Sequence, residues 1–253
     1  MICINCAGKN IKLENKEGVV HASRCECFKC GCDGSGDFFT EEDGIGKRSA
    51  CECVEVATRA KLINRAFLPG RFVKSTMQNY IPKSPTQAIA KKKCQDFVTG
   101  ERWLLLAGTP GTGKTHLAVA TAFELLEQGK SVQFFEFSSL LAEIRAGYGE
   151  DKSELDLIKP FLGCDFLIFD ELGKGRCTEF ERTVLDQIVC ALWNRATCRP
   201  IFTSNYSASV NLEDPLHLGV RLGQRVDSRI MGESDYVELT GADFRQDDGR
   251  VRV

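Results

Sequence analysis

Short apolar runs alternate with stretches of helical periodicity from residue 103 onward. Runs of this kind predict five strands, which we place at 103–107, 132–137, 165–169, 200–204 and 236–239. The runs 104–106 and 166–169 are apolar at successive positions, which is typical of central strands covered by helices on both faces. Because helical stretches lie between the strands, the pattern predicts an α/β fold with a five-stranded parallel sheet and crossover helices.

The first quarter of the chain follows a different pattern. Residues 1–60 hold few aliphatic side chains, many Cys and Gly, and no sustained helical or strand period, so we expect this segment to need a staple in order to fold. Residues 61–93 combine a short helix, ending near Ala66, with several Pro and Gly positions, as in a connector. We therefore divide the chain into a cysteine-rich module (1–60), a connector (61–93) and an α/β domain (94–253).

Composition limits the choice of partners. The chain is 43% hydrophobic and 27% charged, as in globular proteins, and its net charge of -2 excludes a generally basic protein that binds any polyanion. Any contact with nucleic acid must then be local. The N-terminus does not resemble a signal peptide, and no apolar run approaches the ~20 residues that span a bilayer, so we expect a cytoplasmic protein with no membrane partner.

The segment between the first strand and the next helical stretch is a candidate phosphate-binding loop. It fits the pattern Gly, four residues, Gly-Lys-Ser/Thr, with the residues Gly108, Thr109, Pro110, Gly111, Thr112, Gly113, Lys114 and Thr115, followed by His116. Glycines allow backbone N–H groups to face a polyphosphate at the N-terminus of the helix over 116–128, which Gly129 closes. Lys114 adds a positive charge at the β- and γ-phosphates, and the Thr115 hydroxyl can bind Mg²⁺. The loop predicts ATP and Mg²⁺ as cofactors.

Two later strands end in polar side chains. Asp170 and Glu171 follow the strand at 165–169, and Asn205 follows the strand at 200–204. Ligands of parallel sheets gather at the carboxyl ends of the strands, so these side chains should lie beside the phosphate loop. We assign Asp170 to Mg²⁺, directly or through water, Glu171 to polarising the attacking water, and Asn205 to the water or the γ-phosphate. A solvated acidic pair and an ordinary strand-ending asparagine are the alternatives.

Together these segments resemble the helicase-loader and transposition-helper branch of the AAA+ ATPases, the DnaC, DnaI and IstB proteins. The matching segments are 68–72, 79–80, 113–118, 170–173, 203–205 and 222–230, and the resemblance runs from about residue 59 to 245. It implies a P-loop AAA+ three-layer sandwich and ATP hydrolysis. It also makes Lys114, Thr115, Asp170 and Glu171 the ATP and magnesium residues and Asn205 the first sensor.

The resemblance further implies an active site shared between subunits. It makes Arg229 an arginine finger offered to the γ-phosphate of a neighbouring subunit, with Arg225, one helical turn earlier, as the second candidate. Without the resemblance, an arginine on a helix is more often solvated or salt-bridged. A finger in trans implies self-assembly on ATP and a slow monomeric ATPase. The chain ends at Val253, soon after Arg229, and we expect no C-terminal helical lid.

In this branch a helical element after the second strand helps to hold single-stranded DNA. The matching region is 138–161, with Arg145, Lys152 and Lys159 as candidate phosphate contacts. An ordinary amphipathic helix with solvated charges is the alternative.

Eight of the thirteen cysteines fall within the first 53 residues. They form the close pairs Cys3 and Cys6, Cys25 and Cys27, Cys30 and Cys32, and Cys51 and Cys53. Pairs two or three residues apart suit Zn²⁺, because a tight turn can aim both thiolates at one tetrahedral centre. Eight thiols would serve two zinc ions; one zinc with four spare thiols, or none, are the alternatives. Spacing does not decide the pairing, but the segment 32–53 resembles the zinc-binding segment of some DnaI-type loaders, which leaves Cys3 and Cys6 to join Cys25 and Cys27.

The combined prediction is an ATP-dependent DNA replication protein that loads a helicase. By resemblance, its zinc module docks a hexameric replicative helicase, while the ATPase domain assembles on ATP and helps to place that helicase on single-stranded DNA. Acidic residues outnumber basic ones in residues 1–60, which disfavours a DNA-binding finger there. Two rival hypotheses are a transposition helper acting with a transposase on duplex DNA, and a zinc adaptor that uses ATP as a structural ligand.

Overall fold

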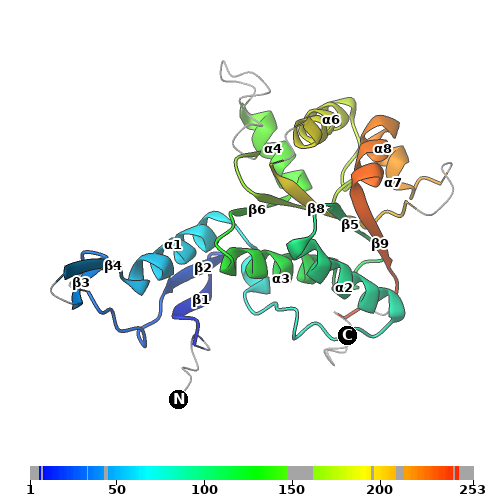
Figure 1. Cartoon of the computed structure of the whole chain (residues 1–253). Helices are drawn as coiled ribbons and strands as arrows, with labels where there is room; N and C mark the ends of the chain where they lie inside the picture. Colours follow the sequence, from blue (N-terminus) through cyan, green and yellow to red (C-terminus); the bar gives the residue numbers. More distant parts are fainter. Residues whose placement is uncertain are drawn as a thin grey trace.

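The computed structural model describes residues 6, 8–32, 34–42, 45–147, 162–194, 197–208, 214–241 and 243–244. Its centre is a sheet of five strands in the order β6-β7-β8-β5-β9, and every neighbouring pair is parallel (Figure 1). The strands are β5 (Trp103–Gly108), β6 (Val132–Glu136), β7 (Phe166–Asp170), β8 (Arg199–Thr203) and β9 (Ser234–Leu239). The predicted five-stranded parallel sheet is confirmed.

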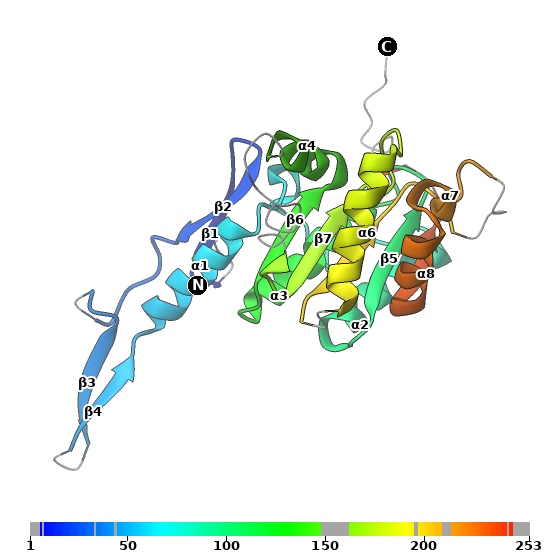
Figure 2. The same cartoon turned by 90° about the horizontal axis from the view of Figure 1, so that it is seen from above.

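Helices cover both faces of this sheet and complete three layers. On one face lie α2 (Pro85–Thr99) and α3 (Lys114–Glu127), and on the other lie α4 (Phe137–Gly147), α6 (Glu179–Asn194), α7 (Leu218–Leu222) and α8 (Gln224–Glu233) (Figures 1 and 2). Successive strand residues point to opposite faces, so Leu104 and Leu106 join one buried core while Leu105 joins the other. Within the described part of the chain, none of the helices combines the length and the apolar character needed to cross a membrane.

The strand order places the phosphate loop at a switch point. The first strand of the sheet, β5, lies between β8 and β9, while the helix that follows it leads to β6 at the far edge. Ligands of open α/β sheets bind where the connections from two neighbouring strands run to opposite sides of the sheet. The helix after the loop, α3, ends as predicted near Gly129, which has φ +75°; Lys130 donates its N–H to Leu125 and Gly129 donates to Leu126.

The N-terminal part contains more regular structure than its sequence indicates. It forms two hairpins, β1 (Ile11–Lys16) with β2 (Val19–Arg24) and β3 (Asp37–Glu42) with β4 (Ile45–Ala50), and these are followed by α1 (Glu52–Arg65) and a 3-10 turn, η1 (Gly70–Phe72). The sequence analysis predicted no particular strand or helix in residues 1–60, so these elements are additional to it. Each strand is six residues long and contributes few buried side chains. The alternation of apolar and polar residues is therefore too short to be recognised in the sequence.

The first hairpin and α1 lie against the nucleotide-binding domain, whereas the second hairpin projects away from it at the far end of α1 (Figure 2). Val20, Ala22 and Val56 belong to the same buried core as Leu117 of α3. The boundaries that we expect after residues 60 and 93 fall inside α1 and α2. The division into three parts stays a prediction.

Candidate functional site

The glycine-rich loop joins β5 to α3 in a conformation that requires glycine. Gly108 has φ +120°, and a Cβ there would lie 2.0 Å from the Leu239 carbonyl oxygen. Gly113 has φ +92°, and its Cβ would lie 2.4 Å from the Tyr80 ring. The buried Lys114 ammonium donates to the carbonyl oxygens of Gly108 and Thr109, each at 2.8 Å. A fixed cation therefore lies inside a loop that leads into a helix N-terminus, which is the arrangement that binds polyphosphates.

A buried carboxylate lies beside the loop at the end of β7. Asp170 is 3% exposed and accepts hydrogen bonds at Oδ1 from the hydroxyls of Thr115 (2.8 Å) and Thr203 (2.6 Å). Burial raises the pKa of Asp170, and the two hydroxyls oppose this rise in pKa by stabilising the charged form. Oxygen ligands at a partly enclosed site are those that Mg²⁺ prefers. Asp170 and Thr115 thus lie together as the sequence predicts.

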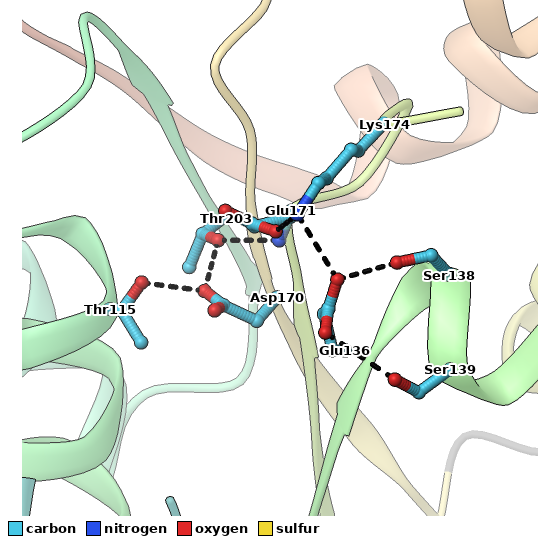
Figure 3. A network of polar contacts seen from close by, with 8 residues as sticks. All are labelled: Thr115, Glu136, Ser138, Ser139, Asp170, Glu171, Lys174 and Thr203. Atoms are coloured by element: carbon cyan, nitrogen blue, oxygen red, sulfur yellow. Dashed lines mark hydrogen bonds and ion pairs between the residues drawn. The ribbon is translucent and has the colours of Figure 1, made fainter. Parts of the chain in front are cut away.

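The neighbouring carboxylate, Glu171, has other partners (Figure 3). Its backbone has φ +59°, and its N–H donates to Thr203 Oγ1 at 3.0 Å. Its side chain forms an ion pair with Lys174, which also lies 3.2 Å from Oε1 of Glu136 at the end of β6. Asp170 therefore contacts hydroxyls, whereas Glu171 contacts a cation.

The phosphate loop and Glu171 line one pocket of about 370 Å³. Lys114, Thr115, Thr203 and the exposed Asn205 contribute to the same wall, so the structure brings the predicted phosphate-side residues together. The remaining lining residues are Phe72, Asn79, Tyr80, Ile81, Pro110, Gly111, Gly113, His116 and Phe244. One end of the pocket is polar and charged, and the other is aromatic and aliphatic.

The aromatic end includes residues to which the sequence analysis gave no role. Tyr80 is buried, donates its hydroxyl to the Thr112 carbonyl oxygen at 2.9 Å, and lies 5.4 Å from the ring of His116 and 5.8 Å from that of Phe244. Phe244 donates its backbone N–H to the Gly111 carbonyl oxygen at 3.0 Å. Burial lowers the pKa of His116, which favours the neutral ring. Thr203, which joins Asp170 to Glu171, was also missed, although it lies inside a segment that the resemblance uses.

These residues fit a magnesium nucleotide. The enclosed ammonium of Lys114 and the glycine backbone suit the phosphates, and the pair Asp170 and Thr115 offers hard oxygen ligands to Mg²⁺. The apolar wall suits a flat base. No other described pocket combines these features.

Comparison with known proteins agrees with this site. The model of the family described as "IstB-like ATP binding protein" matches residues 56–249, which is most of the chain. The chain belongs to the IstB-like ATP-binding proteins. This membership confirms the predicted resemblance to DnaC and IstB proteins and makes the chain a P-loop AAA+ ATPase.

Individual relatives of this IstB-like ATPase point the same way. It is 26% identical over 212 residues to the replicative helicase loader DnaC of Escherichia coli (strain K12), covering 81% of this chain and 83% of DnaC. It is 31% identical over 133 residues to the uncharacterized protein YdaV of the same strain, covering 51% of this chain and 54% of YdaV, so the match spans about half of that relative. A crystal structure of the DnaC helicase loader superposes with a TM-score of 0.59 at 27% identity, covering 67% of this chain and 99% of that one. The DnaI crystal structure (TM-score 0.56, 20% identity, covering 71% and 95%) shares the fold.

The two finger candidates of the IstB-like ATPase lie apart from its own pocket. Arg229 and Arg225 project from α8 towards Asp186 of α6, at 3.3 Å and 3.5 Å from its carboxylate oxygens. The Arg229 guanidinium also lies over the Trp193 ring, which is 51% exposed. Neither arginine is among the residues that line the nucleotide pocket. Either arginine could therefore contact only a nucleotide that is bound by another subunit. The role of these residues as arginine fingers stays a prediction.

The predicted DNA-contacting region is described only in part. Its first residues form α4, where the Arg145 guanidinium lies over the Phe180 ring at 4.9 Å. Lys152 and Lys159 lie outside the described residues. The three basic residues therefore stay predictions as phosphate contacts.

The N-terminal cysteines gather in two clusters. Cys30, Cys32, Cys51 and Cys53 form one, in which the Sγ atoms of Cys30 lie 3.0 Å from Cys32 and 3.5 Å from Cys51, and those of Cys32 and Cys53 lie 3.6 Å apart. A zinc tetrahedron with Zn–S distances of about 2.3 Å has S···S edges of about 3.8 Å, so these thiols fit one ion.

The second cluster contains Cys6, Cys25 and Cys27, with 3.3 Å between the Sγ atoms of Cys6 and Cys27. Cys3, the predicted fourth ligand, lies outside the described residues. The grouping agrees with the pairing that the DnaI resemblance implies.

Each cluster contains a thiol whose pKa is lowered, although neighbouring thiols raise the pKa of Cys30 and of Cys53 in the first cluster. The backbone N–H of Cys53 lowers the pKa of Cys51 to about 6. Burial raises the pKa of Cys6, but hydrogen bonds from Cys27, Asn10 and Gly8 outweigh it and bring that pKa to about 7. Zn²⁺ binds thiolates, so each cluster offers at least one ligand that is ready near neutral pH.

Proposed function

We propose that this IstB-like ATPase is a DNA replication protein that loads a replicative helicase onto single-stranded DNA and hydrolyses ATP at interfaces between its own subunits. The observation that carries the proposal is the similarity to the replicative helicase loader DnaC, which spans most of both chains. The family match over residues 56–249 includes every residue that lines the nucleotide pocket.

The roles of the pocket residues follow from their contacts. Lys114 binds the phosphates, and Thr115 and Asp170 hold Mg²⁺, which neutralises charge on the β- and γ-phosphate oxygens. Thr203 keeps the Asp170 carboxylate oriented by its hydrogen bond. Glu171 orients the attacking water and accepts its proton, and Asn205 contacts the water or the γ-phosphate.

Assembly on ATP completes the site. Arg229, or Arg225 in its place, leaves Asp186 and reaches the γ-phosphate bound by the neighbouring subunit. The Arg225 side chain is exposed, whereas the pair of Arg229 with Asp186 is partly buried. A phosphate carries more charge than a carboxylate, so it competes with Asp186 for either arginine. ATP binding then favours the assembled state, and hydrolysis favours its release.

The two cysteine clusters bind one Zn²⁺ each and shape the N-terminal segment as a docking module for the hexameric helicase. Support for a protein-binding task comes from the acidic character of this segment and from its second hairpin, which projects away from the ATPase domain (Figure 2). Single-stranded DNA lies against the region that begins with α4.

Subunit mixing tests the proposal. Steady-state phosphate release is measured with and without single-stranded DNA for the intact protein, Arg229→Ala, Lys114→Ala and a 1:1 mixture of the two variants. We expect DNA to stimulate the intact protein and each variant alone to be nearly inactive. The mixture should regain activity, because about a quarter of the interfaces in a random assembly combine an intact pocket with an intact finger.

The control is Lys92→Ala, since this exposed lysine pairs with Asp96 on α2, away from the pocket. Full DNA-stimulated activity of Arg229→Ala would show that this arginine is no finger.

One alternative keeps the same chemistry. A transposition helper would share the ATPase domain, and the matched family model carries the IstB name. Duplex DNA would then stimulate phosphate release more than single-stranded DNA of equal length.

A structural-nucleotide adaptor would bind ATP without turnover, and Glu171→Gln would then leave phosphate release unchanged.

A further inference from the structure

A tight turn after β7 brings a lysine back onto the proposed catalytic glutamate. The Lys174 N–H donates to the Glu171 carbonyl oxygen at 3.0 Å, and Gly173 has φ +80°, which such a turn requires at its third position. The Lys174 ammonium thereby reaches the Glu171 carboxylate, and Figure 3 shows it lying between Glu171 and Glu136.

The backbone around this ion pair is fixed. Arg221 of α7 donates to the carbonyl oxygens of Gly173 and Gly175, each at 2.7 Å. The Glu171 N–H is held by Thr203 at the other end. A change in the contact between Lys174 and Glu171 therefore comes from their side chains or from a displacement of Glu136, which lies outside this turn.

The second carboxylate is connected to α4. Glu136 ends β6, and α4 begins at the next residue; the hydroxyls of Ser138 and Ser139 donate to the two oxygens of Glu136. The Ser138 hydroxyl, with a smaller contribution from Lys174, lowers the pKa of Glu136, so this carboxylate stays charged and competes with Glu171 for the lysine. A shift of α4 moves Glu136 and with it the position that Lys174 prefers.

An ammonium bound to a carboxylate draws away the electron density with which that carboxylate would orient water and accept a proton. The Lys174 side chain is 53% exposed, and an ion pair this exposed changes an equilibrium by about fivefold at most. The restraint is therefore weak enough to be released without unfolding the turn.

We propose that Lys174 and Glu136 are positioning residues for ATP hydrolysis: while Lys174 binds Glu171 it holds this carboxylate away from the attacking water, and when it moves to Glu136 it frees Glu171. This inference rests on the proposed role of Glu171. It adds a link from α4 to the catalytic carboxylate within one subunit.

Substitutions of Lys174 and of Glu136 are expected to change kcat in opposite directions. Lys174→Gln removes the restraint and is expected to raise kcat without DNA about two- to fivefold, with the Kd of a fluorescent ATP analogue within twofold of the wild-type value. Lys174→Arg keeps the cation and should return kcat toward the wild-type value. Glu136→Gln leaves the cation with Glu171 alone and is expected to lower kcat, but to have no effect in the Lys174→Gln background. Lys92→Ala, an exposed position away from the pocket, is the control for the three single variants and the double variant, and should keep the wild-type kcat.

A second readout needs no turnover. In the nucleotide-free protein with ¹⁵N-labelled lysine, the Nζ signal that disappears in Lys174→Gln should shift in both Glu136→Gln and Glu171→Gln. The inference is overturned if this signal moves in neither variant, if Lys174→Gln lowers kcat, or if Glu136→Gln acts equally in both backgrounds. Turnover that survives Glu171→Gln would instead contradict the proposed role of Glu171 itself, whereas an inactive Glu171→Gln with an unaltered Lys174→Gln rate would contradict only the restraint.

Discussion

At the scale of single residues, one hydroxyl links the Asp170 carboxylate to the backbone of Glu171. Thr203 Oγ1 donates to Asp170 and accepts from the Glu171 N–H, which a hydroxyl can do at once. We expect Thr203→Val to lower the free energy of unfolding by about 1–3 kcal/mol, because it leaves buried polar groups without partners, and to weaken Mg²⁺-dependent ATP binding. Thr203→Ser, which keeps the hydroxyl, should retain both properties.

The loss in free energy of unfolding caused by Thr203→Val should also depend on pH. Burial already raises the pKa of Asp170 in the folded state, and losing the Thr203 hydroxyl raises it further. A folded state with a raised carboxyl pKa is favoured at low pH and loses stability as pH rises through that pKa. The variant should therefore lose less stability near pH 4 than at pH 7 in denaturant unfolding without metal; an equal loss at both would show that Asp170 is not the affected group.

At the scale of elements, the sequence predicts what depends on local pattern. The five strands are confirmed with ends shifted by at most two residues, because β5 and β7 are apolar over most of their length and β6, β8 and β9 each contain aromatic or β-branched residues that favour strands. The hairpin of β1 and β2 was missed since its two-residue turn uses Glu17 (φ +53°) and Gly18 (φ +85°), a weaker signal than Asn-Gly. The pocket wall was missed because Phe244 reaches Tyr80 only through the tertiary fold.

The aromatic residues of the pocket lead to a further prediction. If the base packs against Phe244 and Tyr80, Phe244→Ala should weaken ATP and ADP binding alike by about two- to tenfold, the amount expected for one aromatic contact. Tripolyphosphate binding should not change, since phosphates contact the other end of the pocket. The measurement is competition against a fluorescent nucleotide, with Ile89→Ala, an exposed position on α2, as the control. A parallel loss of tripolyphosphate binding would mean that the phosphate loop itself was disturbed.

At the scale of the whole molecule, α1 joins one of the cysteine clusters to the ATPase core. Cys51 immediately precedes α1 and Cys53 lies in its first turn, while Val56 and Ile63 are buried in the core shared with α3. Among the residues whose burial is described, none of β3 or β4 belongs to either hydrophobic core, so we expect the fold of this hairpin to depend on the cluster formed by Cys30, Cys32, Cys51 and Cys53. Removing zinc should disrupt the docking module and spare the pocket.

Zinc counting and chelation test this dependence. We expect two zinc ions per chain, one in Cys32→Ser and one in Cys27→Ser, while Cys177→Ser, far from both clusters, keeps two. Chelation should abolish helicase binding and leave the Kd for ATP within about twofold, because the core around Leu117 does not need the metal. The apparent affinity for zinc should weaken as pH falls below the pKa values of the metal-free thiols of Cys6, about 7, and Cys51, about 6, since protons then compete with the metal for the thiolates. A single zinc in the wild-type chain would contradict the site at Cys6, Cys25 and Cys27, and equal loss of ATP and helicase binding on chelation would show that the two parts fold as one unit.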